Sequence, residues 1–219
     1  GMRTPTSPDL LLLPEEEYLL SPTVASKRRL EFTMGRVAAR EAITKLLGTP
    51  APPILKGPNG EPVWPVGIVG SIAHTTEQAL AIVAKKHDAL SLGIDMERLD
   101  RSMDLALTKK LCTPEESNWV HETSNLSEQK LRFIFCAKEA VYKALFPLTG
   151  SIRGFLDVAM FPPPGSLAEF QTRAVLQIDW GSGWDQRKEI LVNGTTLQNH
   201  LVCWVNQRGQ TKGVKSLVD

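Results

Sequence analysis

The sequence lacks the features that mark membrane, disulfide-rich or nucleic-acid-binding proteins. It has three cysteines, Cys112, Cys136 and Cys203, with no Cys-x-x-Cys pattern, which argues against a disulfide framework and a zinc site. No apolar run approaches the roughly 20 residues that cross a bilayer. The 25 Lys and Arg residues nearly balance the 24 Asp and Glu residues, so the overall charge does not favour nucleic acid or an anionic membrane. We therefore expect a cytoplasmic protein in which any anion-binding site is local.

What is present is enough apolar material for a substantial core. The chain has 219 residues, 42% of them hydrophobic and 22% charged, which suits one large domain or two small ones. Helical periodicity over residues 24–47 is followed by a Pro- and Gly-rich loop and three short strand patterns, and a second helix is again followed by short strands. This order predicts an α+β fold of two similar halves, residues 1–98 and 99–219, that meet at a cleft. Residues 207–219 read as a polar tail.

The second helix carries charge on an otherwise apolar pattern. Glu139 and Lys143 are four residues apart and therefore lie on one helical face. Pro147 predicts the end of this helix. Taken alone, the pair is most simply a solvated ion pair on a helix surface, with a functional site as the alternative.

A strand ending in Gly-Ile-Asp-Met-Glu at residues 93–97 offers a second candidate. Residues two apart in a strand project to the same side, so Asp95 and Glu97 present their carboxylates together. Mg²⁺ is usually held by one or two protein carboxylates with phosphate oxygens and water, which this pair could supply. Two acids at the end of a strand are also common as solvated charges.

Basic and polar side chains occur in the first half at positions that suit an anion. Arg36 and Arg40 share a helical face and could hold a phosphate, although surface solvation explains the same spacing. His74 ends a predicted strand beside hydroxyl residues and could donate to an anion, or it could be structural.

Together these stretches resemble a known family. The segments 93–97 and 135–143 resemble the paired signature of the 4'-phosphopantetheinyl transferase superfamily, and the single-chain, Sfp-type group is the nearest match. The segments 35–40, 60–65 and 70–74 follow the order and spacing of the enterobactin synthase component D group. The resemblance spans residues 35–143 and leaves the two ends of the chain uncovered.

The resemblance implies an enzyme that transfers the 4'-phosphopantetheine group of coenzyme A to a serine of an apo carrier protein. Adenosine 3',5'-bisphosphate would be released, and the acceptor would be an acyl, peptidyl or aryl carrier, with siderophore biosynthesis as one setting. The implied fold has two α+β halves related by a pseudo-twofold axis, with the active site between them. The implied form is a cytoplasmic monomer without a membrane span or nucleic-acid partner.

The resemblance also implies residue roles. Asp95, Glu97 and Glu139 would hold Mg²⁺ or Mn²⁺, with Glu139 and Lys143 as the catalytic residues. Whether Glu139 or a metal-bound hydroxide takes the serine proton stays open. Lys138 lies about 100° around the helix from Glu139 and is expected at the cleft rim, touching a coenzyme phosphate. The implied coenzyme-binding residues are Arg36, Arg40, Lys56, Gly57, Ser71, His74, Lys138 and Lys143. Ala73 stands where many relatives have a second serine.

Two other functions fit the same residues. A magnesium-dependent pyrophosphohydrolase of coenzyme A or a nucleotide could use the same carboxylates. A non-catalytic coenzyme A binding module would need Glu139 only as half of a helix ion pair. For a carrier-docking surface, position alone suggests Met103, Lys109 and Lys110.

Overall fold

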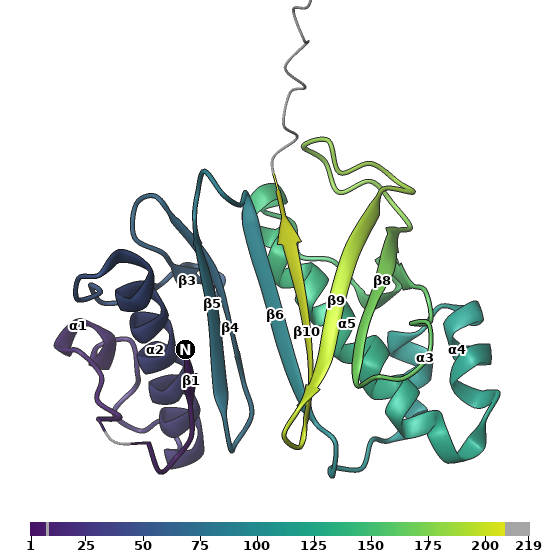
Figure 1. Ribbon diagram of the computed structural model, residues 1–219, viewed down its shortest axis with the longest axis horizontal. Coiled ribbons are helices and arrows are strands. Elements are labelled where there is room, and N and C mark those ends of the chain that lie inside the picture. Colours follow the sequence, from purple (N-terminus) through teal and green to yellow (C-terminus); the bar gives the residue numbers. More distant parts are fainter. Residues whose placement is uncertain (8, 209–219) are drawn as a thin grey trace, which may run out of the picture.

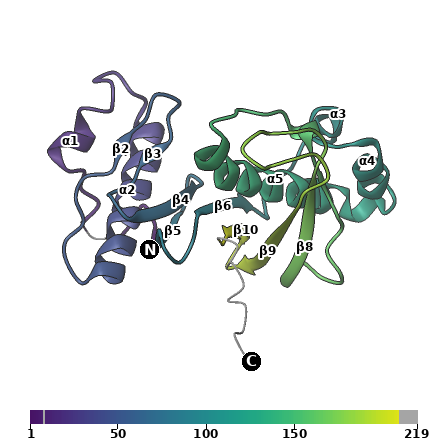
Figure 2. The ribbon, with the colours of Figure 1, turned by 90° about the horizontal axis from the view of Figure 1, so that it is seen from above.

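The long helices α2 (Ser26–Leu47) and α5 (Ser127–Thr149) each cover one sheet in this α+β protein (Figure 1). The structure, a computed structural model, describes residues 1–7 and 9–208, so nearly all of the predicted tail at residues 207–219 lies outside the described residues. Viewed from above, the elements before and after residue 90 form two bodies side by side (Figure 2). The predicted α+β architecture with two halves is confirmed.

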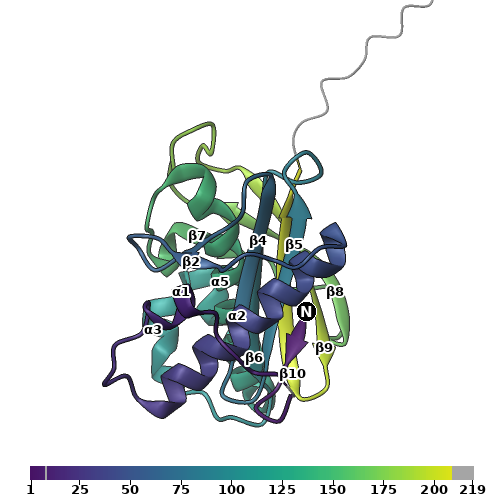
Figure 3. The same cartoon turned by 90° about the vertical axis from the view of Figure 1, so that its left-hand side faces the viewer.

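The first half is built on α2. Its three-stranded antiparallel sheet has the order β1-β5-β4, and α2 lies across that sheet (Figure 3). Met34, Ala38 and Ile43 of α2 pack with Ile54 and Ile68 in one buried cluster. α2 ends at Gly48, which adopts the left-handed conformation that glycine accommodates best. The remaining elements are α1 (Pro14–Glu17), β1 (Met2–Arg3), β2 (Leu55–Lys56), β3 (Pro62–Val63), β4 (Ile68–His74) and β5 (Ala79–Lys85).

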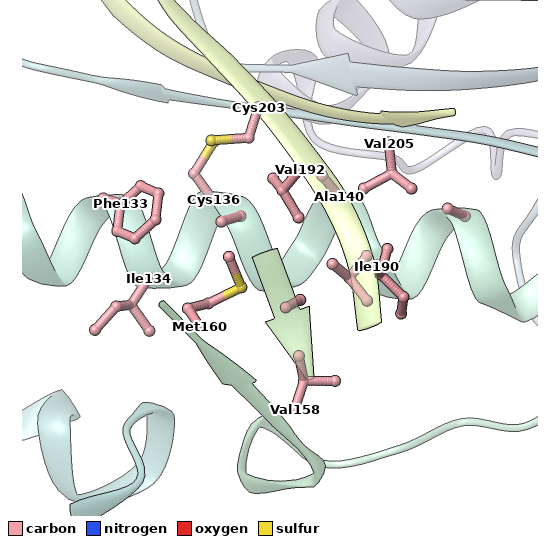
Figure 4. Close-up of a cluster of buried hydrophobic side chains, with 14 of the residues drawn as sticks. Phe133, Ile134, Cys136, Ala140, Val158, Met160, Ile190, Val192, Cys203 and Val205 are labelled. Carbon is pink, nitrogen blue, oxygen red and sulfur yellow. The ribbon is translucent and has the colours of Figure 1, made fainter. Parts of the chain in front are cut away.

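The second half packs α5 on a five-stranded antiparallel sheet of order β6-β10-β9-β8-β7. Figure 4 shows Phe133, Ile134 and Ala140 of α5 in the buried cluster that also takes side chains from β7, β9 and β10. The elements are β6 (Ser91–Arg98), η1 (Leu105–Leu107), α3 (Thr108–Leu111), α4 (Pro114–His121), η2 (Ser124–Leu126), η3 (Phe155–Asp157), β7 (Val158–Met160), β8 (Glu169–Leu176), β9 (Glu189–Leu197) and β10 (His200–Gln207).

The acidic strand β6 belongs to the second sheet. It pairs with β10 along its whole length, with Asp95 opposite Cys203. The predicted division after residue 98 assigns this strand to the first half, whereas the structure places it in the sheet of the second half. Alternating hydrophobicity identifies β6 as a strand, but it cannot say which sheet the strand joins.

β4 and β6 are the facing edge strands of the two sheets, and they meet through side chains. The backbone N–H of Ile94 donates to Ser71 Oγ at 3.0 Å. Ala73, Ile94, Met96 and Val202 form a small buried cluster across the seam. The site residues on β6 are therefore fixed relative to the first half as well as the second.

Gly93 lets α5 approach β6 closely. A Cβ atom placed on Gly93 would lie 1.9 Å from the carbonyl oxygen of Ala140 and 2.7 Å from the backbone nitrogen of Ala144. Only glycine allows this approach without a backbone shift. This contact sets the spacing between the strand that carries Asp95 and the helix that carries Glu139.

α5 continues through Pro147, where the sequence predicts its end. The helix runs to Thr149 and closes at Gly150, whose N–H donates to the carbonyl of Phe146 at 2.8 Å. Pro147 cannot donate to the carbonyl of Lys143 and its ring crowds that carbonyl, but only two helical residues follow it, so little of the helix is affected. None of the helices in the described part of the chain is long and apolar enough to cross a membrane.

Candidate functional site

A cavity of about 1060 Å³ lies between the two halves, where the cleft is predicted. The first half contributes α2, β4 and the loop before β4. The second half contributes β6, the C-terminal part of α5 and residues 150–155. Asp95 of the predicted strand pair lines this cavity together with both members of the helix pair, Glu139 and Lys143.

Asp95 and Lys143 form the central contact. Lys143 Nζ lies 2.6 Å from Asp95 Oδ1 and 3.2 Å from the carbonyl oxygen of Ile94. Asp95 is buried, and its Oδ2 atom has no hydrogen-bond partner among the described residues. A buried carboxylate oxygen without a donor is costly unless a ligand satisfies it.

The two glutamates beside Asp95 are held in unfavourable surroundings for negative charge. Burial and the neighbouring Asp95 raise the pKa of Glu97 to about 7, although Arg101, Lys143 and Arg132 lower it. Burial and Asp95 also raise the pKa of Glu139, and Lys143 offsets part of this effect. Asp95 thus repels the negative charge of each glutamate, and a bound cation would relieve this repulsion.

The predicted metal ligands are close but not gathered around one point. Glu97 is not among the described residues that line the cavity. Within residues 1–7 and 9–208, no three His, Cys, Asp or Glu side chains are placed so that they could hold a metal ion. The unpartnered Asp95 oxygen and the all-carboxylate donor set nevertheless fit the preferences of Mg²⁺ or Mn²⁺.

Arg36 places a positive charge on the first-half wall of the cavity. Its guanidinium carbon lies 4.4 Å from the centroid of the Phe32 ring, and Nη2 donates to the Leu55 carbonyl at 3.4 Å. Its Nε atom has no partner in the part of the chain that the structure describes. Burial lowers the pKa of Arg36 to about 10, more than the favourable Glu16 charge raises it. This guanidinium suits an anionic ligand, and Lys56 lines the same cavity.

His74 lies in a second polar group that the sequence predicts only in part. Its Nε2 atom is 3.4 Å from Arg28 Nη1. Glu31 Oε2 lies 4.0 Å from Arg28 Nη1 and 4.0 Å from His74 Nδ1. Burial lowers the pKa of His74, and the Glu31 charge opposes this. Arg28 and Glu31 are absent from the predicted set, although the spacing of Arg28, Phe32 and Arg36 by four residues places them on one helical face.

Three of the predicted coenzyme-binding residues, Arg40, Gly57 and Lys138, do not line the cavity. Arg40 does not line the cavity but pairs with the fully buried Glu16 and donates to the Leu11 carbonyl at 2.5 Å. Helical spacing cannot show that Glu16 needs this countercharge. Gly57 also lies outside the lining, beside Glu61, whereas Ser71 lines it and accepts the Ile94 N–H.

Lys138 is fully buried, so its expected position at the cleft rim is wrong. Its ammonium donates to Glu116 Oε2 at 2.7 Å and to the carbonyls of Leu111 and Phe155 at 2.8 Å. These three acceptors satisfy all three ammonium protons. The 100° rotation from Glu139 points Lys138 toward α4, not toward solvent.

Aromatic side chains form the second-half wall. Tyr142 stacks on Trp180 with ring centroids 5.5 Å apart, and the rings of Tyr142 and Phe155 are nearly perpendicular with centroids 5.4 Å apart. The Tyr142 hydroxyl donates to the Gly154 carbonyl at 2.6 Å. Phe146 and Ile152 extend this wall, which also includes Arg153. Arg28, Arg36 and Lys56 line the first-half side, so that wall is the more cationic of the two.

Comparisons with known proteins match both halves of the chain. Residues 15–84 match the model of the 4'-phosphopantetheinyl transferase N-terminal domain, and residues 91–204 match that of the 4'-phosphopantetheinyl transferase superfamily. The second match begins at residue 91, the first residue of β6. The comparison thus places β6 with the second half, as its pairing with β10 does.

Several curated proteins are similar in sequence. The 4'-phosphopantetheinyl transferase PptT of Mycobacterium tuberculosis is 38% identical over 192 residues, which are 87% of this chain and 77% of PptT. The 4'-phosphopantetheinyl transferase Npt of Nocardia iowensis is 40% identical over 67% of this chain and 64% of Npt. Enterobactin synthase component D of Salmonella typhi is 33% identical over 62% of this chain and 55% of that protein.

Proposed function

The chain belongs to the 4'-phosphopantetheinyl transferase superfamily, and we propose that it transfers the 4'-phosphopantetheine group of coenzyme A to a serine of an apo carrier protein. The observation that carries the proposal is the Asp95–Lys143 pair, with Glu139 beside it, between the more cationic first-half wall and the aromatic second-half wall. Coenzyme A has the same division, because an anionic nucleotide is joined through a pyrophosphate to an uncharged arm.

The two walls indicate how the coenzyme would lie. Arg28, Arg36, Lys56 and His74 would take the phosphates of the nucleotide, since buried or clustered cations bind phosphate oxygens well. Tyr142, Phe146, Ile152 and Phe155 would take the uncharged arm. The pyrophosphate would then lie between the walls, next to Lys143 and the carboxylates.

A divalent cation is part of this proposal. Asp95, Glu97 and Glu139 would hold Mg²⁺ or Mn²⁺, with rotation of the glutamate side chains to complete the site. When bound, the ion would supply charge neutralisation at the pyrophosphate. Lys143 would stabilise negative charge that develops on the pyrophosphate during transfer.

Glu139 is the proposed acceptor of the serine proton. It lines the cavity beside Asp95, and burial with that neighbouring charge raises the pKa of its carboxyl group. A raised pKa makes the carboxylate a better base near neutral pH. The carrier serine would lose its proton as its oxygen attacks the phosphorus of the phosphopantetheine group. Adenosine 3',5'-bisphosphate would leave with the other phosphorus.

The test is a transfer assay with a panel of apo-carriers. The protein is incubated with coenzyme A, MgCl₂ and acyl, peptidyl and aryl carrier proteins, and each carrier is weighed by mass spectrometry. We expect the mass of one phosphopantetheine group on at least one carrier, with a serine-to-alanine carrier as the control. Coenzyme binding without modification of any carrier would support a binding module instead. Release of phosphopantetheine without a carrier would support a pyrophosphohydrolase.

A further inference from the structure

The two halves contain the same arrangement around a buried glutamate. Leu13-Pro-Glu-Glu16 begins α1 and Thr113-Pro-Glu-Glu116 begins α4, each with proline in the first turn. In both, the glutamate turns back and accepts the N–H of the residue before the proline, at 3.1 Å from Leu13 and 2.6 Å from Thr113. This capping explains how the short helices begin, but not why both glutamates are buried.

Each glutamate also pairs with a cation from the long helix of its own half. Glu16 pairs with Arg40 of α2, and Glu116 pairs with Lys138 of α5 at 2.7 Å. We call these the first-half clamp (Glu16 and Arg40) and the second-half clamp (Glu116 and Lys138). Burial removes water from both charged groups, and this cost offsets most of their mutual attraction, so a buried ion pair adds little to the free energy of unfolding.

The second carboxylate oxygen of each clamp holds backbone that follows the long helix. Glu16 Oε1 accepts the Ile54 N–H at 2.9 Å, and Glu116 Oε1 accepts the Met160 N–H at 2.5 Å. In both halves, a glutamate before the long helix thus fixes the chain after that helix. That chain contributes one wall of the cavity in each case.

In the first half, the held backbone leads to the more cationic first-half wall. Ile54 is fully buried, and the next residue, Leu55, accepts from Arg36 through its carbonyl. Lys56 follows and lines the cavity. The first-half clamp therefore sets the place of Lys56 and one contact of Arg36.

In the second half, the clamp reaches the aromatic second-half wall. Lys138 donates to the Phe155 carbonyl at 2.8 Å, and the Tyr142 hydroxyl donates to the preceding carbonyl, that of Gly154, at 2.6 Å. Lys138 and Tyr142 are one turn apart on α5, immediately before Glu139 and Lys143. One pair from α5 thus holds the loop while the adjacent pair faces the cavity.

We propose that the two clamps are positioning residues, the first-half clamp for the nucleotide phosphates and the second-half clamp for the uncharged arm of coenzyme A. This inference rests on the proposed placement of coenzyme A between the two walls. Neither clamp touches the ligand itself; each acts through the backbone that it holds.

The test separates positioning from stability with paired substitutions. A single Lys138→Met or Glu116→Gln substitution leaves a buried charge without its partner, so we expect a large drop in melting temperature. The double variants are Glu116→Gln with Lys138→Met, and Glu16→Gln with Arg40→Met. Each removes both charges at similar side-chain volume, so its melting temperature should lie closer to that of wild type than the melting temperatures of the single variants do. The exposed pair Arg173 and Glu189, joined at 3.0 Å, supplies the control variant Arg173→Met with Glu189→Gln.

The affinities for two ligands distinguish effects on the two walls of the cavity. Titration calorimetry in metal-free buffer measures the affinity for two ligands. Coenzyme A has both the nucleotide and the uncharged arm, whereas adenosine 3',5'-bisphosphate lacks the arm. We expect the second-half double variant to bind coenzyme A about tenfold more weakly and the bisphosphate within about twofold of wild type. The first-half double variant should lose about tenfold for both ligands, and the control should match wild type.

Equal loss of both ligands in the second-half double variant, or no loss of either, would overturn the proposal. Loss of coenzyme A alone in the first-half variant would do the same. If the double variants do not fold, Glu116→Asp and Glu16→Asp make the same comparison, because each keeps the charge but shortens the side chain that holds the backbone. Failure of the proposed function looks different, because a wild type that binds both ligands but modifies no carrier leaves the binding pattern intact.

Discussion

Lys143 Nζ lies 2.6 Å from Asp95 Oδ1, and the other oxygen of the same carboxylate, Oδ2, is buried without a partner among the residues that the structure describes. Asp95 is therefore only half satisfied. One oxygen holds the lysine toward the cavity, and the other is free for a cation. A single buried carboxylate can in this way place a cationic side chain and a metal ligand side by side.

Replacement of Glu139 by Gln should reduce the transfer rate by about 10²- to 10⁴-fold, since the amide cannot accept the serine proton. The change keeps the shape of the side chain, so the melting temperature should stay near that of wild type. Mass spectrometry of the carrier over time gives the rate. The control is Glu122→Gln, at an exposed glutamate that pairs with Lys130. Full activity of Glu139→Gln would remove this residue from the mechanism.

Removal of divalent metal should stop transfer. In the proposed complex, Asp95 and Glu139 would lie beside an anionic pyrophosphate, with Glu97 next to Asp95, and without a cation the repulsion between these charges would oppose the reaction. We expect no carrier modification in EDTA, and recovery when Mg²⁺ or Mn²⁺ is added in excess. Mg²⁺ should also raise the melting temperature of wild type more than that of Asp95→Asn. An unchanged rate in EDTA contradicts the metal site.

Binding of adenosine 3',5'-bisphosphate should show a pH dependence that comes from His74. Burial lowers the pKa of His74, so the ring is neutral at pH 7 in the free protein. A bound phosphate favours the protonated ring, so His74 contributes more binding as the pH falls from 8 to 5.5. The affinity ratio of wild type to His74→Gln should rise over this range by about tenfold.

The ratio in this experiment cancels protonation of the ligand, which is the same for both proteins. Calorimetry at several pH values supplies both affinities. A ratio that stays constant with pH would show that His74 does not meet the phosphate.

Gly93→Ala should destabilise the protein by about 3 kcal/mol or more, because its Cβ would meet the Ala140 carbonyl and force β6 away from α5. Gly154→Ala is the matched control, since a Cβ there would meet its nearest atom, Asp157 Oδ2, at 3.7 Å. Denaturant unfolding measures both. Similar free energies of unfolding for the two variants would mean that the close approach at Gly93 is relaxed easily.

The sequence predicts where helices and strands lie along the chain better than it predicts which elements pack or pair with one another. Periodicity places a helix at residues 24–47, and the structure has α2 at Ser26–Leu47. The same pattern cannot tell that β6 pairs with β10, because strand partners are set by contacts far apart in the chain. Pro147 misleads because the cost of a proline is small enough for the helix to continue two residues beyond it, to Thr149.

The candidate site shows the same division. Spacing places Asp95, Glu139 and Lys143 on suitable faces, and all three line the cavity. For the other basic residues, spacing alone could not separate Arg36 from Arg40 or reveal the burial of Lys138. Those outcomes depend on Glu16 and Glu116, which lie more than 20 residues away along the chain and need a buried countercharge.

The meeting of β4 and β6 has a consequence for the chain if its halves separate. Each strand is an edge of its own sheet, and Ser71 Oγ occupies the Ile94 N–H that would otherwise face outward. Separated halves would expose these edges together with Ala73, Ile94 and Met96, a combination that invites aggregation or exchange of strands between molecules. The seam that encloses the cavity therefore also protects each sheet from pairing with another copy.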